Sequence, residues 1–138
     1  MKQLFSALFL LTALGACRSK DAAPSSDPAL VGRWQLKNRQ CYCAPGTQPS
    51  EEIVFEANGK FQLYRDGQLV NQGTYLTGVE PVCPGAPSQP LLKLTSQAAT
   101  ANGFARGGNY TFQGAALVID EGTYCVPDWP VSTYQRVP

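Results

Sequence analysis

The chain beyond residue 30 alternates apolar and polar positions with a period of two, which is the pattern of half-buried β-strands. Trp34 and Leu36, for example, alternate with Arg33, Gln35 and Lys37. No stretch beyond the first 16 residues repeats apolar residues at the spacing of an amphipathic helix. We therefore predict an all-β domain of eight short strands, near residues 33–37, 52–56, 60–64, 72–75, 91–96, 105–112, 116–120 and 132–137.

Tight turns separate several of these segments and favour one architecture. Residues 57–59, 66–67 and 113–114 each contain a glycine between two predicted strands, and the Asp-Gly pair at 66–67 is a strong hairpin signal. Strands joined in simple sequence order favour an eight-stranded antiparallel up-and-down β-barrel, closed so that no edge stays exposed. A two-layer antiparallel sandwich is the alternative. A barrel of this size is filled by side chains or holds one small ligand.

The first 17 residues have the features of an export leader. A short start containing Lys2 precedes a largely apolar stretch at 4–16, which is too short to span a bilayer. The small residues at 15–16 stand directly before Cys17, and this ending resembles the lipobox of bacterial lipoproteins. The resemblance implies removal of residues 1–16 as a signal peptide and membrane anchoring by lipid on Cys17. An ordinary secretory signal that leaves Cys17 free is the alternative.

Residues 17–29 follow as a predicted tether. They are polar and rich in proline and serine, with no apolar periodicity, which is typical of a flexible linker before a folded domain at 30–138. Ser19, rather than an aspartate, follows Arg18, so the pattern that retains enterobacterial lipoproteins in the inner membrane is missing. We therefore expect an outer-membrane lipoprotein of a Gram-negative bacterium, which faces the periplasm or the cell surface.

An ordered series of motifs runs along the predicted domain. It starts with Gly32 and Trp34 in a Gly-x-Trp pattern and continues through 53–55, 58–61, 73–75, 117–119 and 134–136. The series resembles small bacterial lipocalin-like lipoproteins over nearly all of residues 30–138. The resemblance implies a barrel in which Trp34 sits at a closed end under Arg136, with a cation–π contact of about 0.5 to 2 kcal/mol. The chain is shorter than true lipocalins and lacks their C-terminal helix, which argues against a large ligand cavity.

Four cysteines besides Cys17 lie in predicted loops rich in proline and glycine. An even number in an exported chain predicts two disulfides among Cys41, Cys43, Cys83 and Cys125. The ring between the first two is small and strained, so we expect one of that pair to bond with Cys83 and the other with Cys125. In an up-and-down barrel Cys125 meets the pair easily, whereas the loop at 78–90 starts from the opposite end. A thiolate site for zinc or copper(I) is the alternative, but we predict no metal and no cofactor.

Composition excludes several functions. The whole chain carries 11 Lys and Arg against 10 Asp and Glu, and loss of Lys2 with the leader leaves ten of each, so nothing favours binding to nucleic acid. Histidine is absent, which excludes the common Ser-His-Asp and Cys-His nucleophile systems. The adjacent acidic pairs at 51–52 and 120–121 would point to opposite faces of a strand, and we interpret them as solvated surface and a strand end. We therefore predict a protein that is not an enzyme.

Two kinds of binding function remain. By analogy with the family, we expect a small apolar ligand held by interior residues that are equally the expected core: Phe55, Phe61, Leu63, Tyr75, Tyr110 and Phe112. The alternative is an envelope module that binds a protein, such as a protease or lysozyme inhibitor, through its disulfide-linked loops. The aromatic candidates for a binding rim, which could equally cap the barrel, are Tyr42, Tyr124 and Trp129. A filled interior favours the protein-binding alternative.

Overall fold

The computed structural model describes residues 26–41, 48–81, 83–96, 107–121 and 130–138. The predicted leader, the predicted lipidation site Cys17 and most of the predicted tether lie outside these residues. In the described part, no helix is long and apolar enough to cross a membrane.

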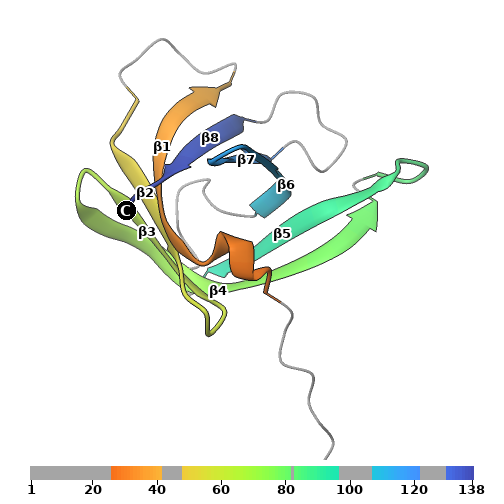
Figure 1. The fold of residues 1–138 in the computed structure, drawn as a ribbon, viewed down its shortest axis with the longest axis horizontal. Helices are drawn as coiled ribbons and strands as arrows, with labels where there is room; N and C mark the ends of the chain where they lie inside the picture. Colours follow the sequence, from red (N-terminus) through yellow and green to blue (C-terminus); the bar gives the residue numbers. More distant parts are fainter. Residues whose placement is uncertain (1–25, 42–47, 82, 97–106, 122–129) are drawn as a thin grey trace, which may run out of the picture.

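The described residues form one short 3-10 helix and eight antiparallel strands that close into a barrel (Figure 1). Each strand pairs with its neighbours in the chain, and the last pairs with the first. The predicted up-and-down barrel is therefore confirmed, and the sandwich alternative is wrong. The elements are η1 (Pro28–Leu30), β1 (Gly32–Gln40), β2 (Glu51–Phe55), β3 (Lys60–Arg65), β4 (Gln68–Pro81), β5 (Ser88–Ser96), β6 (Gly107–Gln113), β7 (Ala116–Asp120) and β8 (Val131–Arg136).

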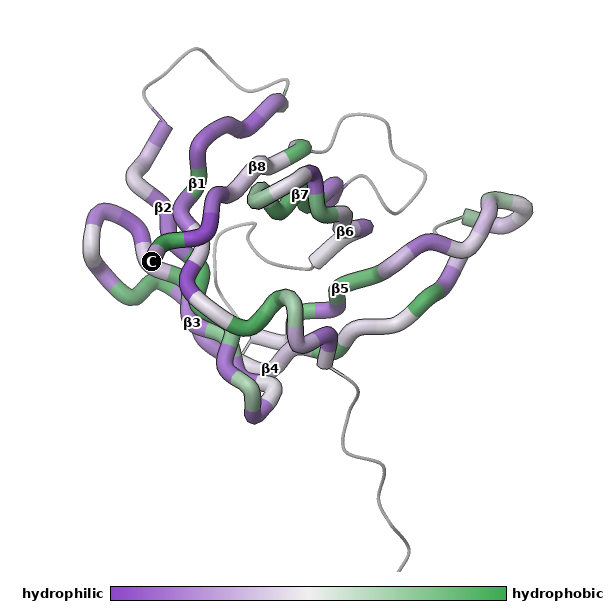
Figure 2. Tube along the Cα trace, viewed as in Figure 1, coloured by the Kyte–Doolittle hydropathy of each residue, from purple (hydrophilic) through white to green (hydrophobic). Residues whose placement is uncertain are grey.

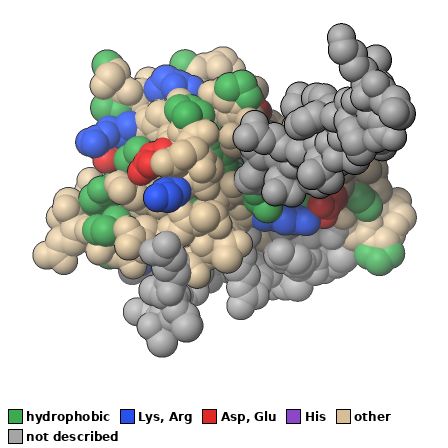
Figure 3. All heavy atoms as spheres, turned by 90° about the horizontal axis from the view of Figure 1, so that it is seen from below, with side chains coloured by type: hydrophobic (Ala, Val, Ile, Leu, Met, Phe, Trp, Pro, Cys, Tyr) green, Lys and Arg blue, Asp and Glu red, His purple; other side chains and the backbone are tan. Residues whose placement is uncertain are grey.

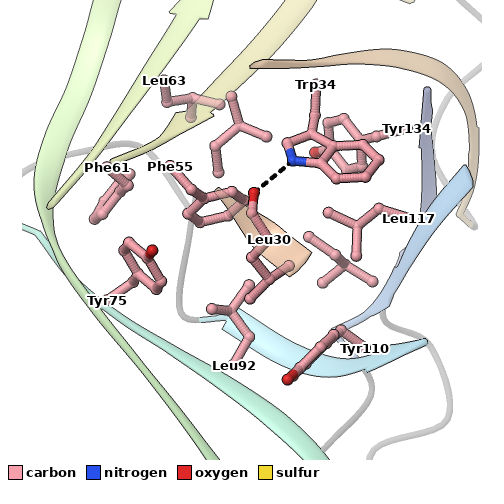
Figure 4. Close-up of a cluster of buried hydrophobic side chains, with 12 residues drawn as sticks. Leu30, Trp34, Phe55, Phe61, Leu63, Tyr75, Leu92, Tyr110, Leu117 and Tyr134 are labelled. Carbon is pink, nitrogen blue, oxygen red and sulfur yellow. Dashed lines mark hydrogen bonds between the residues drawn. The ribbon is translucent and has the colours of Figure 1, made fainter. Parts of the chain in front are cut away.

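Alternation along the strands builds one continuous apolar core. In β2, Glu51, Ile53 and Phe55 are buried, while the two residues between them are only partly so. Hydrophobic and hydrophilic positions alternate in short stretches along the tube in Figure 2. The buried side chains meet inside the barrel (Figure 4) and are Leu30, Trp34, Ile53, Phe55, Phe61, Leu63, Tyr75, Leu92, Tyr110, Leu117, Ile119 and Tyr134.

One end of the barrel, which we name the closed end, is covered by residues 26–31. The indole Nε1 of Trp34 donates a hydrogen bond to the carbonyl of Leu30 at 2.7 Å. The guanidinium carbon of Arg136 lies 4.4 Å from the centre of the Trp34 ring. Arg136 also donates to the carbonyls of Val31 at 2.8 Å and Ala29 at 2.6 Å. The contact implied by the Gly-x-Trp resemblance is thus present, and it fastens the covering segment as well as the barrel.

The same segment is held on its other side by β4 and β6. The backbone N–H of Asp27 donates to Thr77 Oγ1 at 3.0 Å, and the hydroxyl of Tyr110 donates to Asp27 Oδ2 at 3.0 Å. Gly32 then leads into β1 with a φ of +139°, and a Cβ there would crowd the guanidinium of Arg136. Residues 27–29, which composition assigned to the tether, therefore belong to the folded unit.

Strands β4 and β5 extend further than predicted. Their pairing runs through Val79 opposite Pro90 to Pro81 opposite Ser88, so most of the predicted loop at 78–90 is strand. β5 pairs with β6 only over residues 91–93, and the proline is tolerated where the strand has a partner on one side only. In Figure 1 this hairpin projects beyond the rest of the barrel.

One predicted interior residue is not buried. Phe112 is 38 % exposed, although its ring centre lies 6.0 Å from that of Trp34 and 6.0 Å from that of Tyr110. Its strand β6 ends at Gln113, next to the turn at the closed end, so the ring packs against the rim of the core. The prediction that Phe112 lines the interior is therefore wrong, whereas the other five candidates are buried.

Replacing Arg136 with alanine tests the closed end. We expect the R136A variant to lose about 2 kcal/mol of unfolding free energy, because the cation–π contact and two charge-assisted hydrogen bonds disappear together. Urea denaturation measures the loss as a lower midpoint at unchanged slope. The matched control is R33A, which removes an arginine that is 56 % exposed on the neighbouring strand β1 and forms an ion pair with Glu52. A loss for R136A no larger than the roughly 0.5 kcal/mol expected of R33A would contradict the assignment.

Candidate functional site

Polar side chains line the interior at the end opposite the closed end, which we name the polar end. Among the residues that the structure describes, six strands contribute to this polar layer directly, β7 contributes through the residue that follows it, and β6 does not contribute. The polar layer consists of Arg39 on β1, Glu51 on β2, Arg65 on β3, Asn71 on β4, Ser96 on β5, Glu121 directly after β7, and Ser132 and Tyr134 on β8. Strand register brings them together, with Arg39 opposite Ser132 and Glu51 opposite Arg65.

Glu51 is the centre of this layer and is fully buried. Its Oε1 accepts hydrogen bonds from Arg39 Nη2 at 2.6 Å and from the hydroxyl of Tyr134 at 2.8 Å. Its Oε2 accepts from Arg65 Nε at 3.1 Å and, at 3.4 Å, from Arg39 Nη1. Arg39 Nε donates to Ser132 Oγ at 2.9 Å. One carboxylate therefore ties together β1, β2, β3 and β8.

The network has the features of a buried ion pair that several hydrogen bonds stabilise. Removing charged groups from water costs several kcal/mol each, and attraction offsets that cost only when every partner is well placed. The side chain of Arg39 is 9 % exposed and that of Arg65 is 26 % exposed, so solvent reaches the network mainly at Arg65. Two guanidinium groups against one carboxylate leave the trio of Arg39, Glu51 and Arg65 with a net positive charge.

A second carboxyl group faces this trio from the end of β7. Burial raises the pKa of Glu121 to about 7, Arg39 and Arg65 oppose the rise, and Glu51 and Asp120 add to it. Burial likewise raises the pKa of Tyr134, and the charge of Glu51 raises it further. Burial and the neighbouring carboxylates therefore favour the protonated form of Glu121, whereas the two arginines favour its ionised form.

Asn71 adds a buried donor to the layer. The residue is 3 % exposed, and its Oδ1 accepts a hydrogen bond from Ser96 Oγ at 2.5 Å. Its amide Nδ2 has no hydrogen-bond partner among the residues that the structure describes. A buried donor without a partner costs about 1 to 3 kcal/mol, and such groups are uncommon in folded proteins. Because Asn71 stands opposite Leu63 on the interior face, the donor belongs to the barrel interior.

The sequence interpretation missed most of this layer. Glu51 was predicted to be solvated surface together with its neighbour, which is wrong because Glu51 is fully buried. The signal was present, since Glu51 lies two residues before Ile53 and shares its face, and Arg65 lies two residues after Leu63. If the alternation of inward-facing positions continues through these charged residues, the side chains of Glu51 and Arg65 are both expected to face the interior.

The cysteines are only partly described. Cys41 follows β1 at the polar end, Cys83 lies in the β4–β5 connection at the closed end, and each is disulfide-bonded. Cys43, Cys125 and the rim candidates Tyr42, Tyr124 and Trp129 lie outside the described residues, so the pairing and the rim stay predictions. Within the described ranges, no group of three His, Cys, Asp or Glu side chains lies together as a metal site. Figure 3 shows basic and acidic side chains intermixed on the face seen from below.

Neutralising Glu51 tests the network. In the E51Q variant Arg39 and Arg65 lose the charge of the carboxylate that they share, and we expect a loss of about 3 to 5 kcal/mol of unfolding free energy. The neighbouring E52Q variant is the control, because Glu52 faces outward and its partner Arg33 is mostly exposed, which limits its effect to about 1 kcal/mol or less. If urea titrations give equal losses of unfolding free energy for the two variants, Glu51 contributes no more to stability than the exposed Glu52.

The buried Glu121 makes stability depend on pH in a defined direction. Its pKa of about 7 in the folded barrel exceeds the ordinary value of 4.5, so the folded state holds the proton more tightly than the unfolded state. Its contribution to stability is therefore present below pH 4.5 and is lost as pH rises to 7, by about 3 kcal/mol in total. The midpoint urea concentration of unfolding should decrease from pH 5 to pH 8 in the wild type. It should decrease to the same extent in the exposed control E80Q, and it should stay nearly constant in E121Q. A parallel fall in E121Q would assign the pH dependence to another group.

No protein-family model, no curated protein and no solved structure matches the chain. The resemblance to lipocalin-like lipoproteins therefore stays a prediction from the motifs. What the barrel does has to be argued from its polar layer and its closed end.

Proposed function

We propose that this protein is a non-catalytic binding protein, anchored to a membrane through Cys17, that holds a small ligand at the polar end of a lipocalin-like barrel. One observation carries the proposal. A layer of interior polar groups, with a buried and unpartnered donor on Asn71, lies on top of an apolar core. Such convergent polar groups at the mouth of a barrel are typical of the part of a pocket that fixes a ligand's orientation.

The apolar interior itself is a poor ligand site. The expected ligand-binding residues Phe55, Phe61 and Tyr75 are at most 1 % exposed, and the rings of Phe55 and Tyr75 meet edge to face at 4.9 Å. In Figure 4 these side chains point toward one another across the interior. A purely apolar ligand would have to displace packed side chains, which close-packed interiors resist. The proposal therefore replaces the apolar ligand with one that presents a polar group to the polar layer.

The direction of the tether fits this arrangement. Hydrogen bonds fix Asp27 at the closed end, opposite the polar layer, and Cys17 stands ten positions before it in the sequence. The ten residue steps from Asp27 to Cys17 reach at most roughly 35 Å when fully extended. A barrel held in this way at the outer membrane of a Gram-negative bacterium would direct its polar end away from the lipid.

A protein partner is the second candidate, and the projecting β4–β5 hairpin favours it. Val79 on this hairpin is 69 % exposed and Leu76 is 42 % exposed, although both are apolar. Exposed apolar side chains on a projecting element are a common feature of protein interfaces. In this case the barrel would act as a rigid support for an inhibitor-like surface.

Native mass spectrometry of residues 18–138, produced in an oxidising compartment, tests both proposals. We expect the intact protein to carry a small additional mass that disappears on denaturation. The N71L variant should lose that mass, whereas Q72L, which changes the neighbouring outward-facing residue, should keep it. The denatured mass should also lie four hydrogens below the reduced value, as two disulfides require.

Two results would contradict the ligand proposal. One is a wild-type protein that never carries an added mass, even when it is purified from its own envelope. The other is an added mass that survives in N71L, which would place the ligand elsewhere. A partner protein released by V79D but not by N71L would instead establish the second candidate.

A further inference from the structure

The far part of the β4–β5 hairpin carries an apolar surface outside the core. We name residues 79–90 the hairpin tip, which projects beyond the rest of the barrel in Figure 1. Tyr75 is buried, but Val79, four residues further along the same face of β4, is 69 % exposed. Val79 pairs with Pro90 on β5, and both Pro90 and Pro81 are exposed. The inward-facing side of this strand pair therefore continues past the core as an apolar face in contact with solvent.

The hairpin tip presents almost no charge. The sequence has no acidic or basic residue between Glu80 and Lys93. These two side chains neutralise one another, because Lys93 Nζ donates to both carboxylate oxygens of Glu80 at 2.7 Å. Burial of charge in a medium of low polarity is costly, so a surface without net charge can enter such a medium at little cost. Prolines supply much of this surface, and the exposed ones are Pro81, Pro84, Pro87 and Pro90.

The chain that leads to Cys17 starts beside this hairpin. The backbone N–H of Asp27 donates to Thr77 Oγ1 at 3.0 Å, and Thr77 lies two residues before Val79 on β4. Ten residue steps separate Asp27 from Cys17 and reach at most roughly 35 Å. The strand from Thr77 to Pro81 spans about 13 Å. A lipid on Cys17 would therefore keep the hairpin tip within a short distance of the bilayer that holds the lipid.

We infer that the hairpin tip is a second membrane contact, which lays the apolar face at Val79 on the bilayer that holds the acyl chains of Cys17. This inference rests on the proposed function, because it requires the lipid anchor. Once the anchor is in place, contact of the tip with lipid is an intramolecular step, so an interaction too weak to bind the free protein is sufficient. Burial of one valine side chain favours the contact by about tenfold.

The prolines of the tip favour a lipid surface over a protein strand. A strand edge recruits another protein through its unpaired backbone N–H groups, and proline has no N–H to donate. Pro81 ends β4 and Pro90 lies where β5 has a partner on one side only, so both edges of the tip lack donors at these positions. A bilayer surface requires no such hydrogen bonds and accepts an apolar face directly.

The test uses the full chain, expressed with its own leader in a Gram-negative bacterium, purified in a neutral detergent and reconstituted into phosphatidylcholine vesicles. The photo-crosslinking residue p-benzoylphenylalanine replaces either Ser88 in the hairpin tip or Gln68 at the polar end of β4, and both sites are exposed. Mass spectrometry then distinguishes lipid adducts from protein adducts. V79D tests the apolar face, and L69D is the matched control, because Leu69 is 48 % exposed on the same strand at the polar end.

The expected result is a lipid adduct about tenfold more abundant at position 88 than at position 68. V79D should lower the adduct at position 88 by about tenfold, and L69D should leave it unchanged. Sodium chloride at about 1 M should not lower it either, because screening weakens contacts between charges and not apolar ones.

Three results would overturn the inference. Equal lipid adducts at positions 88 and 68, or an unchanged adduct at position 88 in V79D, would remove the membrane contact of the tip but leave the anchor standing. A protein adduct in place of lipid at position 88 in intact cells would overturn it in favour of the second candidate function. A wild-type chain that floats with the vesicles no better than C17S would overturn the lipid anchor of the proposed function and this inference with it.

Discussion

Pairing between β1 and β8 is the interaction on which the rest of the structure depends. It joins the first and last strands of the sheet, and side-chain contacts stabilise this pairing at both the closed end and the polar end. Trp34 and Arg136 lie opposite one another at the closed end, and Arg39 and Ser132 do so at the polar end. Without the pairing of β1 with β8, the positions that now face inward would be exposed to water. Neither the apolar core nor the buried ion pairs would then form. The barrel has no free edge between these strands, which also removes a site for unwanted pairing with other chains.

The interior is divided into two parts with different physical roles. Around Phe55, Phe61 and Leu92 the side chains are almost completely buried, and dispersion and the hydrophobic effect stabilise a rigid body. Around Glu51 stability depends on geometry, because a carboxylate bound by two arginines and a tyrosine tolerates little displacement. The rigid apolar core therefore holds the polar layer in place, as a preorganised binding site requires.

Much of the fold could be predicted from the sequence, but the site could not. Eight strands, the 66–67 hairpin and the contact of Arg136 with Trp34 follow from short-range signals: alternation, a turn dipeptide and a motif. The polar layer depends instead on which strands become neighbours, and Arg39 and Glu51 meet only after the barrel has closed. The long β4–β5 hairpin escaped prediction because its prolines read as loop residues, whereas a strand with one free side accepts them.

The covering segment at the closed end also decides when the barrel can form. Arg136 donates to the carbonyls of Ala29 and Val31, and the latter contact spans 105 positions in the chain. A growing chain therefore cannot complete this end of the barrel until residue 136 has emerged, because Ala29 and Val31 bind the last strand of the barrel. Long-range closure of this kind is slow, because the entropy of bringing distant segments together has to be overcome before their contacts form.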